Sequence, residues 1–148
     1  MSMQDFVILD TLYSAGDDHC KKQEITDTDM RIMACTLHQN AAYLILNYAA
    51  QVLNGGHSQW IDNDYYRTEG EYLLRILDHI NGVFCRKVTR LISKANGLHQ
   101  IDDIVDEDEW EGISDDLDKL DTEFYSYSDE FLLEVETWTQ TSIVHAVS

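Results

Sequence analysis

The chain of 148 residues contains no proline and only seven glycines. Proline interrupts helices and is common in turns and at sheet edges, while glycine often ends a helix. A sequence poor in both residues favours helices joined by short connections. We therefore expect an all-α fold, a compact bundle of about six to eight helices, formed by a single domain over residues 1–148.

Cysteine is also scarce, and long apolar runs are missing. Cys20, Cys35 and Cys85 are odd in number and show no C-x-x-C spacing, which argues against a disulfide framework and a zinc site. The first residues lack the basic region and apolar stretch of a signal peptide, and no window of about 18 residues is free of polar groups. We expect a soluble, cytoplasmic protein without membrane contact.

Basic residues are few, with 10 Lys and Arg against 28 Asp and Glu and a net charge of −18. The imbalance is concentrated between Asp102 and Glu136, where sixteen residues are acidic and Lys119 is the one base. Such a field repels nucleic acid and membranes and attracts basic surfaces. A small domain needs a net charge of only about 2–8 for solubility, so the excess calls for another explanation.

The acidic stretch is our candidate partner-binding face. Carboxylates three or four residues apart on a helix are neighbours, at spacings comparable with those of phosphates along DNA. We also expect Trp110 to anchor an interface if it is exposed. The predicted contact residues are Asp102, Asp103, Asp106, Glu107, Asp108, Glu109, Trp110, Glu111, Asp115, Asp116, Asp118, Glu123, Asp129 and Glu130, with Glu134 and Glu136 as an extension.

Hydrophobic periodicity places the helices. It predicts a short helix over residues 3–13, a long one carrying the stripe from Met30 to Val52, a short segment over 57–63, a helix from Thr68 capped by Glu71, and a final helical region over 117–138. Residues 101–113 are predicted to be loop plus a short helix. The predicted breaks are 14–18, Gly55-Gly56, a weak one at Asn81-Gly82, a firmer one at Asn96-Gly97, and 126–128.

The most distinctive local pattern follows the long helix, at residues 54–63. Two adjacent glycines there allow positive φ and a close backbone approach, and the amide side chains can bond freed main-chain groups. We interpret the segment as a structural corner, because His57 has no evident orienting partner for catalysis. The motif residues are Asn54, Gly55, Gly56, Gln59, Trp60 and Asn63.

This corner resembles the Asn-Gly-Gly-aromatic-x-Gln-aromatic-aromatic-x-Asn motif of a family of small helical bacterial proteins, typified by DNA-mimic protein nineteen. His57 and Ile61 stand where the family usually has aromatics. A second similarity is Leu120-Asp121-Thr122-Glu123-Phe124-Tyr125, where the family tends to show Leu-Asp-x-x-Tyr-Tyr. The resemblance covers roughly residues 30–140. It implies an all-helical fold, a negatively charged face that substitutes for DNA, and a homodimer.

Other chemistry finds little support in the sequence. An EF-hand loop starting at Asp106 would need glycine at its sixth position, where Glu111 stands, with Gly112 one residue late. The histidines form no metal-binding pattern, and no phosphate-binding glycine loop is present. We expect neither metal nor cofactor, and no enzymatic activity.

Two functions remain open. In the first, the chain is a DNA mimic that inhibits or regulates a basic nucleic-acid-binding protein: a transcription factor, nuclease, nucleoid protein or defence enzyme. In the second, it is a non-enzymatic immunity-type or scaffold module that recognises one protein by shape, with charge only assisting. Neither function involves direct contact with nucleic acid.

Overall fold

The computed structural model describes the backbone of residues 6–102 and 107–147 and the side chains of 6–100 and 111–143. Within these residues the fold is all-α, as expected, and contains six helices and no strand. The helices are α1 (Val7–Lys22), α2 (Thr28–Ala34), α3 (Leu37–Asp62), α4 (Tyr65–Ile80), α5 (Val83–Asp102) and α6 (Glu107–Val147).

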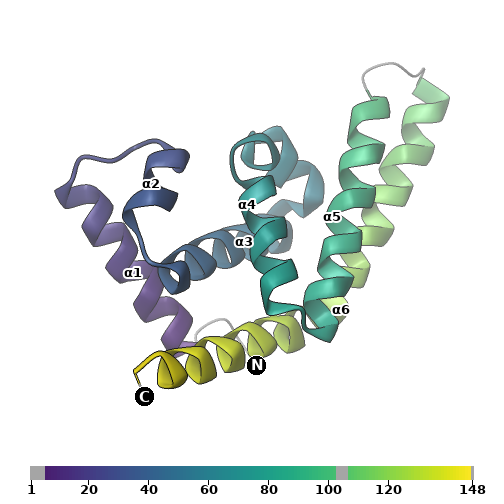
Figure 1. The fold of residues 1–148 in the computed structure, drawn as a ribbon. Coiled ribbons are helices and arrows are strands. Elements are labelled where there is room, and N and C mark those ends of the chain that lie inside the picture. Colours follow the sequence, from purple (N-terminus) through teal and green to yellow (C-terminus); the bar gives the residue numbers. More distant parts are fainter. Residues whose placement is uncertain (1–5, 103–106, 148) are drawn as a thin grey trace.

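Helix α3 runs through the middle of the molecule and packs against α1, α4, α5 and α6 (Figure 1). Its inward face combines alanines, which allow neighbouring helices to approach closely, with leucine and aromatic side chains that fill the core. The largest fully buried side chains include Tyr48 and Trp60 of α3 and Phe124 and Phe131 of α6. The core therefore lies where α3 meets α6.

Helix α6 has two parts, separated by non-helical angles at Tyr127 (φ −137°, ψ 19°). The first part lies antiparallel beside α5, and together they project from the body as a hairpin (Figure 1). The second part turns beneath the body and reaches the start of α1. The break predicted over residues 126–128 is thus confirmed.

Two further breaks lie at Gly55-Gly56 and at Asn81-Gly82. Gly55 and Gly56 leave helical geometry within α3, and the segment after them is helical to Asp62, as predicted. Asn81 adopts left-handed angles (φ 54°) and ends α4 completely, so the break predicted there as weak is a full one.

Three predicted boundaries were wrong because local propensity is a weak guide to where a helix ends. Residues 14–18 do not break α1, which continues to Lys22 with Gly16 buried near Gln39 and Cys35. The pair Asn96-Gly97 does not stop α5, which continues to Asp102 with Gly97 exposed. Residues 107–113 form the first turns of α6 rather than a loop with a short helix.

Two helix starts were also misplaced. The stripe from Met30 to Val52 is divided between α2 and α3, because Thr36 and Gln39 form a reciprocal capping box. Helix α4 begins at Tyr65, not Thr68, and its preceding residue Asp64 is left-handed (φ 71°). The predicted cap Glu71 instead forms an ion pair with Arg75.

Candidate protein-binding face

The first part of α6 is fixed to the corner in α3 by Gly56. Its φ of +78° is a conformation that L side chains rarely adopt, and a Cβ there would lie 2.2 Å from Asp121 Oδ2. Glycine therefore lets the corner backbone approach the Asp121 carboxylate of α6. The two sequence motifs of the chain meet at this point.

A buried chain of hydrogen bonds completes the corner. Asp121 Oδ1 accepts from the backbone N–H of His57 at 2.8 Å and lies 2.6 Å from its ring Nδ1, while the His57 Nε2 lies 2.6 Å from the Tyr48 hydroxyl. The imidazole therefore links Asp121 to Tyr48, with Nδ1 placed to donate to the carboxylate. Burial, together with nearby Tyr127 and Asp121, holds the pKa of Tyr48 well above its usual value.

His57 thus has orienting partners that the sequence did not reveal, since Asp121 lies 64 residues away. His57 and Tyr48 are fully buried and Asp121 nearly so. The three side chains lie inside the core, which supports the structural interpretation of the corner.

The corner amides bond one another rather than main-chain groups, which corrects one prediction. Asn54 donates to Gln59 at 3.0 Å, and both Gln59 and Asn63 donate to Gln51, at 2.8 and 3.1 Å. Trp60 is fully buried. The freed Val52 carbonyl instead accepts from the Tyr125 hydroxyl at 3.0 Å. Asp121 and Tyr125 of the second motif, both on α6, therefore bond main-chain groups at the corner.

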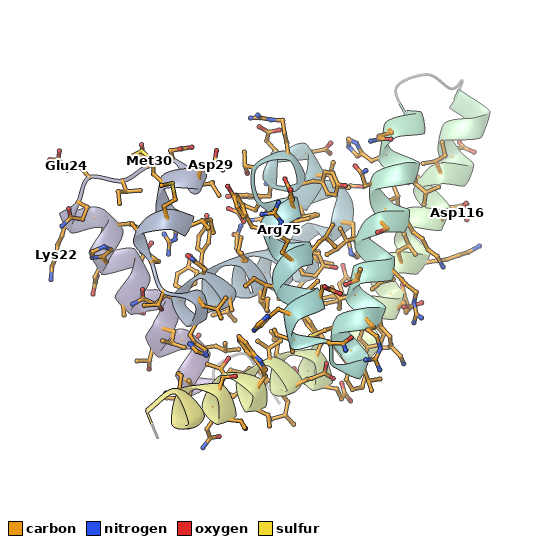
Figure 2. All side chains as sticks on the ribbon, viewed as in Figure 1. Lys22, Glu24, Asp29, Met30, Arg75 and Asp116 are labelled. Carbon is orange, nitrogen blue, oxygen red and sulfur yellow. The ribbon has the colours of Figure 1, made fainter. Side chains whose placement is uncertain are left out.

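The exposed surface of α6 carries the candidate binding face. Of the acidic side chains described between residues 111 and 136, six are exposed. Asp116 points away from the body in Figure 2. We define the acidic face as Glu111, Asp115, Asp116, Asp118, Glu123 and Glu130.

The average density of these carboxylates along the helix axis is close to that of phosphates along one DNA strand. Glu111 and Glu123 are separated by twelve residues, about 18 Å of helix axis at roughly 1.5 Å per residue. Five exposed carboxylates lie within this length, which is one per about 4 Å, against one phosphate per about 3.4 Å along a strand of B-DNA.

The remaining described acids of the stretch face inward, including Glu134 and Glu136, the two residues named as an extension of the face. Glu134 accepts from the backbone N–H groups of Phe84 and Cys85 at 3.0 and 3.1 Å. Glu136 accepts from those of Ile8 and Leu9 at 2.9 and 3.0 Å. Both glutamates therefore cap helix N-termini, where the helix dipole favours negative charge.

Two other acids are not freely exposed. Asp121 belongs to the buried corner, and Asp129 is half-buried and engaged in a contact. The predicted contact residue Asp129 is thus less accessible than Glu130 beside it.

Basic side chains of α5 do not neutralise the acidic face. Arg86 donates to the Asn81 carbonyl at 2.7 Å, and Lys87 lies 5.4 Å from the ring centres of Phe84 and Tyr127. No ion pair joins Arg86, Lys87, Arg90 or Lys94 to any of the six carboxylates of the face, all of which are described. The one ion pair on the face joins Asp116 to Lys119 at 3.7 Å.

A shallow apolar groove borders the acidic face. It lies between α5 and α6, has a volume of about 500 Å³, and is lined in part by Leu98 and Leu120. Lys94, Asp116 and Lys119 stand along its edge. Carboxylates beside an apolar groove give the combination of a polar rim and an apolar centre that protein interfaces use.

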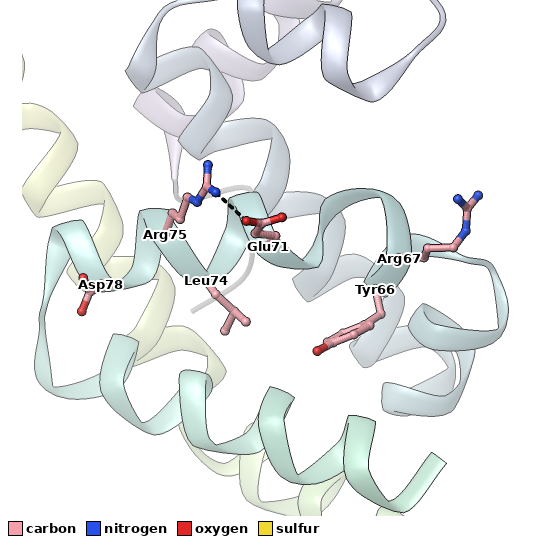
Figure 3. A pocket seen from close by; sticks show the side chains of 6 residues that line it. All are labelled: Tyr66, Arg67, Glu71, Leu74, Arg75 and Asp78. Atoms are coloured by element: carbon pink, nitrogen blue, oxygen red, sulfur yellow. Dashed lines mark hydrogen bonds and ion pairs between the residues drawn. The ribbon is translucent and has the colours of Figure 1, made fainter. Parts of the chain in front are cut away.

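A second groove of about 500 Å³ lies on α4 and has a different character (Figure 3). Its lining residues are Tyr66, Arg67, Glu71, Leu74, Arg75 and Asp78. The Arg75–Glu71 ion pair balances charge there, and the lining contains no nucleophile beside a base. Within the described side chains, no three His, Cys, Asp or Glu gather as a metal site.

Part of the predicted face lies outside the described side chains. This applies to Asp102, Asp103, Asp106, Glu107, Asp108, Glu109 and Trp110, of which Asp103 and Asp106 are also outside the described backbone. The proposed anchoring role of Trp110 stays a prediction.

The corner and the acidic helix together match a known family. A family model described as DMP19-like protein matches residues 33–142. The chain belongs to the DMP19-like family. No curated protein and no solved structure gives a significant match. The match includes α3, with its Gly55-Gly56 corner, and the acidic face, whereas α1 precedes it.

Family membership confirms the resemblance inferred from the two motifs. His57 departs from the aromatic usual at that position, and the structure shows its consequence. An imidazole there bridges Tyr48 and Asp121, which a phenyl ring would leave without these hydrogen bonds. Among the described residues, no helix has both the length and the apolar character to cross a membrane.

Proposed function

We propose that this DMP19-like protein is a DNA mimic whose acidic face occupies the basic groove of a nucleic-acid-binding protein. The observation that carries the proposal is the group of exposed carboxylates on α6, which form no ion pair with α5 and have about the linear density of phosphates on one DNA strand. The family resemblance adds support, because its typifying member acts as a DNA mimic. The role is non-enzymatic and needs no cofactor.

Attraction between the acidic face and a Lys/Arg groove weakens as salt rises. The partner class is a transcription factor, nuclease, nucleoid protein or defence enzyme. Each of these has a groove whose natural occupant is a phosphate backbone, so duplex DNA and the acidic face compete for it. The result is inhibition or regulation without direct contact between this chain and nucleic acid.

The test uses the immobilised full chain and a bacterial lysate at low salt. We expect it to retain a protein that excess duplex DNA releases. A variant with Glu111→Gln, Asp115→Asn, Asp116→Asn and Asp118→Asn should lose this protein.

The matched control changes the same net charge elsewhere, with Asp18→Asn, Glu24→Gln, Asp27→Asn and Asp78→Asn, all of which are exposed. It should retain the partner. Equal loss in both variants, or a captured protein that DNA does not displace, contradicts the mimic proposal.

A shape-recognition module is the second candidate, and one observation favours it. Met33 is 87% exposed and Met30 56%, and both lie on α2 near the half-exposed Leu37. A groove of about 320 Å³ between α2 and α4 lies beside them. This alternative predicts that the four-site charge variant of α6 still binds its partner, and that a variant with Met30→Ser and Met33→Ser does not.

The homodimer stays a prediction. Two-fold pairing of the chain would double its acidic surface into a longer array. Sedimentation equilibrium of the purified chain measures the assembly directly.

A further inference from the structure

Two cysteines far apart in the sequence lie side by side in the structure. Cys20 is in the last turn of α1, Cys35 follows the end of α2, and their Sγ atoms are 3.8 Å apart. Both thiols are free. The pair could not be predicted from the sequence, because fifteen positions separate the residues and the spacing matches no known motif.

The surroundings allow the two sulfur atoms to come closer. A disulfide needs about 2.05 Å between sulfurs, so the Cys35 side chain must move inward by a little under 2 Å. Cys35 has extended backbone angles (φ −103°, ψ 161°) outside the helix, where its N–H donates to the Arg31 carbonyl and its carbonyl accepts from Asn40. Helix α2 contains no buried residue, so its end can adjust at small cost to packing.

The pair is also asymmetric in exposure. Cys20 is 4% exposed, whereas Cys35 is half-buried and therefore accessible to a small oxidant. Burial raises the pKa of the Cys35 thiol, with the nearby Cys20 adding to the shift, while the Arg31 guanidinium favours the thiolate. An accessible sulfur next to a buried partner is the arrangement in which one thiol reacts first and the second resolves it.

We propose that Cys20 and Cys35 form a reversible oxidation site, which a hydroperoxide converts from a dithiol to an intramolecular disulfide. The Cys35 thiolate attacks one peroxide oxygen, the O–O bond breaks, and Cys35 becomes a sulfenic acid. The Cys20 sulfur then attacks the Cys35 sulfur, the S–O bond breaks, and water leaves. The two thiols lose two electrons and two protons; an organic hydroperoxide is reduced to an alcohol and one water, and hydrogen peroxide to two waters.

The product joins α2 to the end of α1. In the reduced protein this connection rests on the Arg31–Asp17 ion pair at 3.1 Å and on a hydrogen bond from the Ile25 backbone N–H to the Cys20 carbonyl. The disulfide closes a short loop containing residues 21–34 and restricts the unfolded chain. Oxidation therefore stabilises the protein and fixes α2, which carries the exposed Met30 and Met33.

The experiment treats the reduced full chain with a small excess of hydrogen peroxide, blocks the remaining thiols, and measures intact mass. The expected product is a monomer that has lost two hydrogen atoms and keeps one blockable thiol. Trypsin cleaves after Lys21 and Arg31, between the two cysteines, so the linkage appears as two peptides released from each other by dithiothreitol.

Cys85 provides the internal control. It is fully buried, and burial raises the pKa of its thiol to about 12. Cys85→Ala should form the disulfide as the wild type does, whereas Cys35→Ser and Cys20→Ala should not. The oxidised wild type should melt roughly 5–10 °C higher than the reduced form, with no such rise in Cys35→Ser.

Three results would overturn the proposal: no loss of hydrogen, linkage to Cys85, or a disulfide between two chains. Retention of the disulfide by Cys35→Ser would do the same. The outcome is independent of the acidic face, because Cys20 and Cys35 lie on α1 and after α2, away from the first part of α6.

Discussion

Gly56 occupies a backbone position that L side chains rarely adopt, and its missing Cβ makes room for a carboxylate. The approach of Asp121 is what allows the imidazole of His57 and the backbone N–H beside it to be satisfied inside the core. A buried polar group without a partner costs about 1–3 kcal/mol, so each bond of the corner matters.

Gly56→Ala should be strongly destabilising. The substitution combines strained backbone with a Cβ 2.2 Å from Asp121 Oδ2, so we expect a loss of at least about 2 kcal/mol in the free energy of unfolding. Urea denaturation measures the effect. Gly97→Ala is the matched control, because no atom lies within 4 Å of its Cβ position, and it should gain about 0.5–1 kcal/mol. Similar losses in both variants would contradict this account.

Glu69 provides a pH-dependent test at the same scale. It is buried and accepts from Tyr43 and from Asn47, and desolvation raises its pKa above the ordinary 4.5, with these hydrogen bonds opposing the rise. The folded protein therefore holds the Glu69 proton more tightly than the unfolded chain. Its contribution to stability is fully present below pH 4.5 and is lost as pH rises through the folded pKa.

Unfolding free energies of the wild type and Glu69→Gln across pH 4–8 measure this contribution. The wild type should lose stability relative to the variant as pH rises from about 4.5, and the difference should become constant above the folded pKa. A difference that grows in favour of the wild type with rising pH would show the opposite shift.

At the scale of the helices, the starts of α1 and α5 depend on carboxylates supplied by the end of α6. Gly82 lets Glu134 approach, since a Cβ there would collide with the carboxylate. Through these contacts the second part of α6 is attached to the first turns of α1 and α5, which are remote from it in sequence.

Removing these caps should weaken the fold. Glu134→Ala and Glu136→Ala each remove an acceptor of two backbone N–H bonds, so each should cost about 1–2 kcal/mol. Glu130→Ala, at an exposed position of the same helix, should stay within about 0.5 kcal/mol. Chemical denaturation compares the three variants, and an equal loss in Glu130→Ala would refute the capping role.

The sequence predicted most of the helices but not these connections. Proline scarcity and periodicity led to the all-α fold, and Gly55-Gly56 marked a corner that the structure contains. The sequence contains the Thr-x-x-Gln pattern of the Thr36–Gln39 capping box, but the apolar stripe continues across it and led us to predict one helix. The inward positions of Asp121, Glu134 and Glu136 could not be predicted. Within an acidic run, residue type alone does not distinguish a carboxylate exposed to solvent from one that accepts buried backbone N–H groups.

At the scale of the whole molecule, the acidic face stores electrostatic repulsion that a bound basic surface would relieve. Like charges at helical spacing each cost a few tenths of a kcal/mol. The first part of α6 belongs to the hairpin that projects from the body (Figure 1).

The variant with Glu111→Gln, Asp115→Asn, Asp116→Asn and Asp118→Asn should therefore be more stable than the wild type at low salt. We expect a gain of about 1 kcal/mol that shrinks as salt rises, because screening removes the repulsion from the wild type. Thermal melting at several salt concentrations gives the comparison. A variant less stable than the wild type at low salt would show that these carboxylates support the fold.

Exposed and inward carboxylates of α6 differ in their tolerance of replacement, and most of the exposed ones precede the change of direction at Tyr127. Before it, most exposed carboxylates need only their charge, so Asp and Glu should exchange freely there. At Glu134 and Glu136, the length of the side chain decides whether two N–H groups are reached, so even Asp should fail. A saturation library of α6 scored for folding should therefore accept either acidic residue at the exposed positions, including Glu130, and reject Asp at Glu134 and Glu136.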